Sequence, residues 1–341
     1  MSTFLLIVVG ILAIVALAQA VRVFELSSAL KGDNPDVTDK DNNTHGLLLL
    51  FFLVFLFGGF LWLVLKYGDV LLPESASEHG KDIDNLWDIS MGLIIIVFLI
   101  TQPLLFVFSY LFRGNKSRKA VYMEHNNKLE LFWTAIPAVV LAGLILYGLS
   151  TWINITSPDN SEQEPLVVEI VAKQFSWTAR YSGGDNTLGY ANVRLIEGAN
   201  ILGVDPDDEA SLDDMVVNEV HLPVNKPVLF KFRSMDVIHS AYFPHFRAQM
   251  NCVPGTKTQF QFTPTITTAE MRQNPDMVTK VDNINEIRAN AGEDSYDFDY
   301  ILLCNKICGS AHYNMQLKIV VESEEEYNAW VKEQKSFAEM L

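Results

Sequence analysis

The chain of 341 residues is 49% hydrophobic, and 41 acidic residues against 25 basic ones give it a net charge of −16. This balance argues against nucleic acid as a partner, because phosphate binding needs clustered lysine and arginine side chains. A negative field attracts a basic protein instead. The three cysteines are too few for a disulfide framework, so two that lie close together are ligands, a redox pair or a single bridge.

Four charge-poor segments predict helices that cross a membrane and contact lipid. A bilayer core of about 30 Å needs about 20 mostly apolar residues in helix, and buried helices of a soluble core are shorter and have a polar face. The four segments are Thr3–Ala20, Gly46–Leu65, Met91–Phe112 and Leu131–Leu149. Pro103 and Pro137 lie inside the last two and predict kinks, which membrane helices tolerate when they pack against neighbours.

The charges of the loops predict the orientation. The loop between the third and fourth segments is basic and contains Arg113, Lys116, Arg118, Lys119 and Lys128. The positive-inside rule therefore places it in the cytoplasm. The acidic loop from Lys66 to Asp88 then lies outside, as does everything after Leu149.

The first segment ends in Ala18-Gln19-Ala20, which resembles a signal-peptidase site. Cleavage there would leave three helices and would put the basic loop outside and the acidic domain inside, against both charge preferences. Retention gives four helices with both termini outside, and it fits an N-terminus without basic residues. We therefore predict that this segment is a membrane helix.

Short β-branched and aromatic runs, separated by proline and glycine, begin at Pro165. Such runs predict an all-β sandwich or barrel of the Greek-key type. The predicted strands are Leu166–Val171, Val220–Leu222, Val228–Arg233, Gln259–Thr263, Tyr300–Cys304 and Gln316–Val321. Residues 205–214 predict a solvated acidic loop, residues 265–294 a polar and partly helical segment, and residues 322–341 a terminal helix with Tyr327, Trp330 and Val331 on one face.

The strongest chemical signal lies between the last two predicted strands. Cys304, Cys308, His312 and Met315 fall within twelve residues, and two thiolates, an imidazole and a thioether form a soft ligand set that suits copper. Spacing alone leaves three alternatives. These are a structural zinc site with another ligand elsewhere, a disulfide between the cysteines, and a methionine that only packs in the core.

A second imidazole could come from His239, which follows the strand that begins at Val228. A lone histidine at a strand end is more often a hydrogen-bonded loop residue. Cys252 is predicted to be a small buried thiol. No role follows for His245, or for His45, His79, His125 and His221, which have no cluster of partners.

Two further stretches give the pattern a specific resemblance. Leu129–Pro137 resembles the start of the second membrane helix of subunit II of haem-copper cytochrome c oxidases, and Gln174–Trp177 resembles the aromatic segment of that family. The two metal-binding stretches follow in family order. The resemblance covers roughly residues 91–321 and implies four transmembrane α-helices followed by an all-β cupredoxin-like Greek-key domain.

The resemblance also implies a binuclear copper A centre with two copper ions. Six residues would hold them: His239, Cys304, Lys306, Cys308, His312 and Met315. The two cysteines would bridge both ions and each histidine would bind one. The methionine and the backbone carbonyl of Lys306 would complete the two coordination spheres.

Two positions depart from the family pattern. The residue midway between the cysteines is usually a glutamate that helps to bind magnesium at the contact with subunit I, and here it is Lys306. A cation cannot replace a carboxylate ligand of a hard metal, so no magnesium site is predicted for this subunit. The aromatic segment usually begins with tryptophan after its glutamine, where electrons arrive, and here that position is Phe175. Trp177 keeps the later aromatic position.

The function implied is electron transfer in a proton-pumping terminal oxidase. The subunit would accept electrons from cytochrome c or from a haem c domain on another chain, since this chain has no C-x-x-C-H motif. It would pass them to haem and copper B on subunit I, where oxygen is reduced to water. The resemblance places the chain in a bacterial inner membrane with a periplasmic domain, beside other oxidase subunits. Glu130 matches an acidic residue at a proton pathway, although a carboxylate also suits the first turn of a helix.

The expected division of the chain has five parts. They are an extra N-terminal transmembrane hairpin (1–68), an outer-side loop (69–90), the family's transmembrane hairpin (91–150), a periplasmic domain (151–321) with a long insertion at about 265–294, and the C-terminal helix (322–341). The extra hairpin and the insertion would contact other subunits or solvent.

Three other functions compete with this interpretation. A quinol oxidase subunit would share the fold but would lack the thiolates of Cys304 and Cys308. A membrane-tethered copper-delivery protein would have no reason to carry the Glu130–Pro137 resemblance. A receptor ectodomain with structural zinc would usually recruit no methionine.

Overall fold

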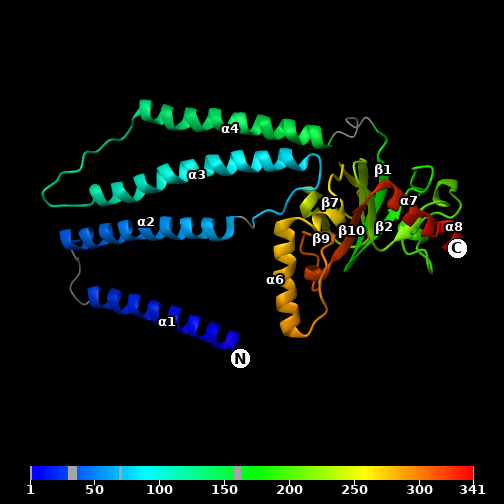
Figure 1. The fold of residues 1–341 in the computed structure, drawn as a ribbon. Coiled ribbons are helices and arrows are strands. Elements are labelled where there is room, and N and C mark those ends of the chain that lie inside the picture. Colours follow the sequence, from blue (N-terminus) through cyan, green and yellow to red (C-terminus); the bar gives the residue numbers. More distant parts are fainter. Residues whose placement is uncertain (1, 30–36, 69–70, 157–162, 341) are drawn as a thin grey trace. The chain divides into compact units, whose positions relative to one another are not determined.

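The computed structural model describes residues 2–29, 37–68, 71–156 and 163–340 (Figure 1). The chain forms two compact units. One contains Met1–Gly68 and Ile94–Asn126, and the other contains Asp69–Leu93 and Asn127–Leu341. Where the chain is described, the first unit is helical and the second includes all of the strands.

Four helices of the described residues are long and apolar enough to cross a membrane. They are α1 (Ser2–Ala29), α2 (Asp39–Tyr67), α3 (Gly80–Leu111) and α4 (Asn127–Thr156). All four predicted segments are therefore helical. The helices continue beyond the apolar runs because polar residues extend the backbone hydrogen bonding outside the apolar part, as at the start of α2, where Thr38 and Asp41 form a capping box.

In the first unit, α2 packs against the later part of α3 through aromatic side chains. The rings of Phe57 and Phe98 are stacked with their centroids 5.3 Å apart. The loop after α3 holds the start of α2, since Arg113 donates to Asn43 Oδ1 (2.6 Å) and the Lys116 N–H donates to Asp39 Oδ1 (3.1 Å). The predicted basic loop thus contacts the N-terminal end of α2.

The second unit contains two five-stranded sheets. The first has the order β3 (Met215–Val217), β2 (Ser176–Tyr181), β1 (Leu166–Lys173), β5 (Val228–Ser234) and β8 (Thr258–Phe262). The second has the order β4 (Val220–Pro223), β10 (Gln316–Glu322), β9 (Tyr300–Cys304), β6 (His239–Phe243) and β7 (Ala248–Cys252). Neighbours pair antiparallel except β1 with β5 and β4 with β10.

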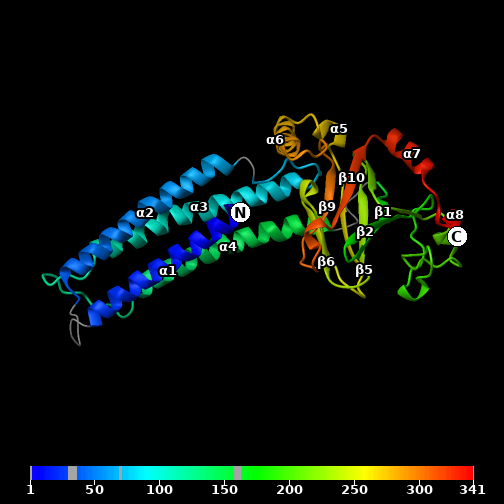
Figure 2. The same ribbon diagram turned by 90° about the horizontal axis from the view of Figure 1, so that it is seen from below.

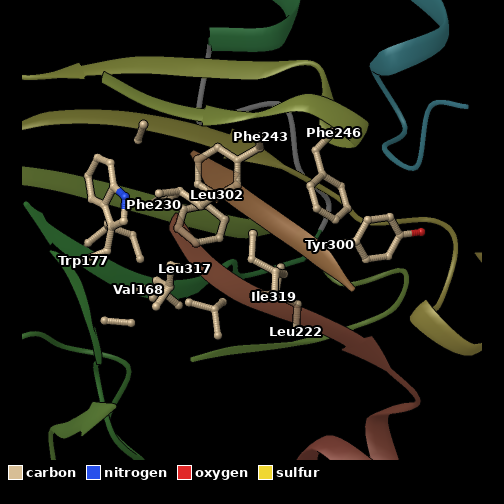
Figure 3. Close-up of a cluster of buried hydrophobic side chains, with 14 of the residues drawn as sticks. Val168, Trp177, Leu222, Phe230, Phe243, Phe246, Tyr300, Leu302, Leu317 and Ile319 are labelled. Atoms are coloured by element: carbon tan, nitrogen blue, oxygen red, sulfur yellow. The ribbon is translucent and has the colours of Figure 1, made fainter. Parts of the chain in front are cut away.

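The core lies between these sheets. Figure 3 shows the buried side chains of Phe230, Phe243 and Leu302 gathered between strands. Along β9, Tyr300, Leu302 and Cys304 are buried, and this alternation is the period of a strand with one face in a core. Cys304 therefore lies on the face of β9 that is directed into the core.

Six of the ten strands in the described residues were predicted from the sequence, and β2, β3, β6 and β7 were not. β3 has only three residues, and β7 (Ala-Gln-Met-Asn-Cys) has few β-branched or aromatic residues. His239 was predicted to follow the strand from Val228, but it is the first residue of a separate strand, β6. A turn from Met235 to Ile238 separates β6 from β5.

The insertion and the C-terminus are helical. α5 (Thr268–Met271) and α6 (Pro275–Ala291) lie in the predicted polar insertion, and α7 (Glu324–Glu333) and α8 (Phe337–Met340) end the chain. Figures 1 and 2 show α6 and α8 on opposite sides of the sandwich. The prediction of one terminal helix over residues 322–341 is therefore wrong in its length. Gln334 adopts an extended conformation (ψ 149°) and ends α7.

The predicted apolar face of the terminal helix packs on the sandwich. Tyr327 is buried, and Trp330 and Val331 pack against the core. The Trp330 ring stacks on His221 of β4, with centroids 4.2 Å apart and planes at 11°. His221 Nδ1 also lies 2.8 Å from Glu322 Oε1. These contacts fasten α7 beside β4.

The acidic stretch 205–214 is not entirely solvated, in contrast to the prediction. Asp214 is buried and pairs with Arg180 of β2 (3.3 Å), which also pairs with Glu169 of β1 (3.1 Å). Arg233 of β5 completes the network with Glu169 (3.2 Å). Burial raises the pKa of Asp214 to about 7, and the neighbouring Arg180 opposes this rise. The network fastens the β1–β2 hairpin to the segment that covers it.

We predict that Arg180→Met lowers the free energy of unfolding of the outer domain by about 3–5 kcal/mol, because it leaves the buried Asp214 without its cation and removes one of the two cations that pair with Glu169. Urea unfolding of the full chain in detergent measures the change. Arg194, which is exposed, provides the matched control, and Arg194→Met should change stability by less than about 0.5 kcal/mol. Equal stabilities of the two variants would contradict the structural role of the network.

Candidate metal centre

The loop between β9 and β10 brings the two cysteines together. Cys304 ends β9, and its N–H donates to the Met315 carbonyl (3.0 Å), which closes the base of the loop. Inside the loop the sulfur atoms of Cys304 and Cys308 lie 3.8 Å apart. Both thiols are free and buried, so the disulfide alternative is not present in the structure.

The other predicted ligand atoms surround these sulfurs. His239 Nδ1 lies 3.8 Å from Cys304 Sγ, and the Lys306 carbonyl oxygen lies 3.2 Å from the same sulfur. On the other side, His312 Nδ1 lies 3.6 Å and Met315 Sδ 3.8 Å from Cys308 Sγ. All six residues singled out in the sequence thus have donor atoms within 4 Å of one of the two cysteine sulfurs.

The pairing of strands explains how His239 reaches the loop. β6 lies beside β9, with Ala241 opposite Cys304. His239 is therefore two residues from the register position of the first cysteine, and its side chain is fully buried. No sequence spacing reveals this proximity, since the two residues are far apart in the chain.

The donor set fits a soft metal better than a hard one. In the described part of the chain, His239, Cys304 and Cys308 form a cluster that could hold a metal ion. Their ligand atoms all lie within 4.8 Å of one another. Two sulfurs, imidazole nitrogen and a thioether favour copper over the oxygen-preferring cations. Burial raises the pKa of the Cys308 thiol to about 11, so a metal must displace its proton on binding.

A carboxylate behind His239 orients the ring, and the sequence analysis did not identify it. Asp236 Oδ1 lies 2.8 Å from His239 Nε2, which leaves Nδ1 directed toward Cys304. The pKa of Asp236 lies below its usual range. Partial burial opposes this shift, but hydrogen bonds from the Gln174 N–H and from His239 outweigh it. Carboxylate–histidine pairs of this kind are common behind metal ligands.

The residues predicted to take up electrons lie next to the loop. Trp177 is buried, with 3% of its surface exposed, and its indole N–H donates to the Met315 carbonyl (3.3 Å). Its ring meets that of His239 edge to face at 6.0 Å. Phe175 is half-buried and packs against the core.

The remaining predicted residues lie elsewhere. Glu130 is exposed in the first turn of α4. Cys252 is fully buried, as predicted, and burial raises the pKa of its thiol to about 12. His245 is buried against Phe298 and Tyr300, and burial lowers its pKa to about 4, which keeps the ring neutral. None of the ligand distances above involves Cys252 or His245.

The fold and the site together define a membrane-anchored protein with a β-sandwich and a soft-metal donor cluster at one loop. Two family models match the chain. That of the cytochrome c oxidase subunit II transmembrane domain covers residues 65–151, and that of the subunit II periplasmic domain covers residues 166–273. These ranges include more than half of the chain.

Two relatives carry the same description. The alternative cytochrome c oxidase subunit 2 of Bradyrhizobium diazoefficiens is 35% identical over 246 residues, which are 71% of this chain and 76% of the relative. The cytochrome c oxidase subunit 2 of Thermostichus vulcanus is 25% identical over 292 residues, 79% of this chain and 80% of the relative. The crystal structure of the periplasmic domain of subunit II from Bradyrhizobium japonicum is 20% identical, with a TM-score of 0.30, and covers 50% of this chain and 93% of that domain.

The chain belongs to the cytochrome c oxidase subunit II family. Its fold is that of the family, with four apolar helices before a cupredoxin-like domain, and the second domain is periplasmic. α1 and nearly all of α2 precede the matched region, so this is a subunit II with additional N-terminal helices. It is a member of a haem-copper oxidase complex, and other oxidase subunits are its partners.

We predict that Lys306→Ala leaves metal binding unchanged, because the atom near Cys304 is the backbone carbonyl, which the substitution retains. The measurement is the copper content and the optical spectrum of the purified full chain. Loss of copper from a folded Lys306→Ala variant would show that the side chain itself has a role in binding.

Proposed function

We propose that this subunit holds a binuclear copper A centre and transfers electrons from cytochrome c, or from a haem c domain, to haem and copper B in subunit I. Oxygen is reduced to water there, and the complex pumps protons. The convergence of four further donor atoms on two adjacent sulfurs is the observation that carries the proposal. In this proposal the membrane is a bacterial inner membrane.

The residues have distinct tasks in this centre. Cys304 and Cys308 would hold the copper through their thiolates, and His239 and His312 would bind it through their imidazoles. The Met315 thioether and the Lys306 carbonyl would complete the donor set. When bound, the copper pair supplies a one-electron carrier whose charge is shared by two metals. The surrounding chain keeps the donors in place, because the loop is closed at its base and His239 is held by Asp236.

Four other expectations belong to the same proposal. Trp177 and Phe175 form the path by which electrons reach the centre, which the contact of the Trp177 ring with His239 supports. Glu130 collects protons at the cytoplasmic start of α4, where a carboxylate suits the first helical turn. The chain divides at residues 68, 90, 150 and 321, which separates the added hairpin from the family's own parts. The Lys306 side chain offers no ligand to magnesium.

The two thiolates distinguish this proposal from a quinol oxidase subunit of the same fold. A quinol-oxidising relative has no need of a copper centre on this domain, whereas here both sulfurs and both imidazoles converge. A copper-delivery protein would not need the family's transmembrane domain, which matches residues 65–151. Structural zinc sites do not use methionine as a ligand, so a zinc site would not explain the Met315 thioether 3.8 Å from Cys308 Sγ.

Replacement of either cysteine tests the copper centre. We expect Cys304→Ser and Cys308→Ser each to abolish the mixed-valence copper spectrum and cytochrome c oxidation, because a hydroxyl is a poor bridge for soft copper. Helix insertion should be unaffected, since it depends on hydrophobicity. Cys252→Ala provides the control with the third buried cysteine and should keep both copper ions. Two coppers and normal turnover in both serine variants would refute the assignment.

Electron uptake can be tested through salt and the aromatic pair. Attraction between the acidic subunit and a basic donor is screened over about 8 Å at physiological ionic strength, so reduction should slow as salt rises. We expect Trp177→Ala to slow reduction without loss of copper and Phe175→Ala to have a smaller effect. Trp177→Phe keeps an aromatic ring and separates packing from the indole N–H. Stopped-flow rates that are indifferent to salt, or unchanged in Trp177→Ala, would mean that the donor is docked permanently or that electrons arrive elsewhere.

A further inference from the structure

The turn between β1 and β2 contacts the metal centre through hydrogen bonds of Gln174, in addition to the contacts of Trp177. Gln174 lies at this turn. Its backbone N–H donates to Asp236 Oδ2 (2.7 Å), and its side-chain amide donates to the Cys308 carbonyl (2.6 Å). Asp236 in turn contacts the Nε2 atom of His239. One residue therefore connects the loop that contains the cysteines with the segment that contains the first histidine.

The neighbouring residues of the turn support the same connection. A Cβ atom at Gly309 would lie 2.7 Å from the Phe175 ring and 3.0 Å from Gln174 Nε2, so the turn lies directly against the residue that follows Cys308. Gly309 has φ 147°, which only glycine adopts readily. Trp177 extends these contacts to the Met315 carbonyl. The turn and the first residues of β2 thus reach both ends of the loop from Cys308 to Met315.

The loop needs an external support of this kind. Asn305, Lys306 and Ile307 are exposed, as are Gly309 and Ser310, and the loop packs little of its own surface. The sheet fixes Cys304 and Met315 at the base of the loop but does not reach Cys308. The hydrogen bond from Gln174 holds the backbone at Cys308 itself.

We infer that Gln174 is a positioning residue that sets the location of Cys308 relative to His239, through its amide on one side and through Asp236 on the other. The inference rests on the proposed copper function for its effect on the centre, but the contact itself is between residues of this chain. Gln174 is exposed, so substitution leaves the core packing intact.

The test uses the full chain in detergent and the variant Gln174→Met, which keeps the length of the side chain and removes the donor. Gln334→Met is the matched control, because the Gln334 amide also donates to a backbone carbonyl, that of Trp330 (3.1 Å), in the C-terminal region. In the metal-free protein we expect amide exchange in residues 304–315 to rise about fivefold in Gln174→Met, as for the loss of one neutral hydrogen bond. The Gln334 variant should leave that segment unchanged.

The copper-loaded protein gives the second measurement. We expect Gln174→Met to keep two copper ions but to shift the visible bands and the paramagnetic resonance pattern of the mixed-valence centre, with Gln174→Glu giving the same shift because a carboxylate cannot donate to the Cys308 carbonyl. Unchanged exchange and unchanged spectra in both variants would overturn the inference. Absence of the two-copper spectrum from the unsubstituted chain would overturn the proposed function instead, while the exchange measurement would still decide the role of Gln174.

Discussion

The pairing of β9 with β10 is the constraint on which the metal centre depends. The ladder ends at Leu303 and Gln316, and just beyond it the Cys304 N–H donates to the Met315 carbonyl, so the intervening residues must form a closed loop that returns to its start. The soft donors of the loop therefore lie on one small piece of backbone. β6 pairs with the other edge of β9 and adds His239 from a distant part of the sequence. The topology of one sheet thus assembles most of the donor set.

The opposite sheet contributes stiffness. Its β1–β2 hairpin is anchored by the charges of Glu169, Arg180 and Asp214 on one face and by the hydrophobic core on the other (Figure 3). The turn of the hairpin lies against the metal loop. A donor cluster that is held by both sheets can change its charge with little movement of its atoms. This property suits a carrier that accepts and releases single electrons, whereas a site that binds a substrate usually needs room to open.

Features whose sequence signal is local could be predicted from the sequence. Apolar runs show helices that cross a membrane, and the donors from Cys304 to Met315 are close enough in sequence to be recognised together. The helix ends were missed because polar residues continue a helix without any hydrophobic signal. Asp236 lies only three residues before His239, and it was missed because an aspartate near a histidine in sequence does not show that the two side chains meet. The role of Gln174 was missed because its contacts, with Asp236 and Cys308, join residues that are far apart in sequence. The burial of Asp214 was missed for the same reason, since ten residues rich in aspartate and glutamate resemble a solvated loop until Arg180 is placed beside them.

The helix α7 covers a sheet edge that could otherwise pair with another molecule. β4 and β3 are edge strands of the two sheets, and an exposed edge can pair with the edge of another molecule. β4 ends at Pro223, which cannot donate to a ladder, and α7 packs beside it through the stacked rings of Trp330 and His221. β3 is only three residues long, and Met215 already forms a bridge with Ser336. The C-terminal segment thereby closes both edges on this side, so the domain can remain concentrated at a membrane surface without joining its sheets to those of adjacent copies.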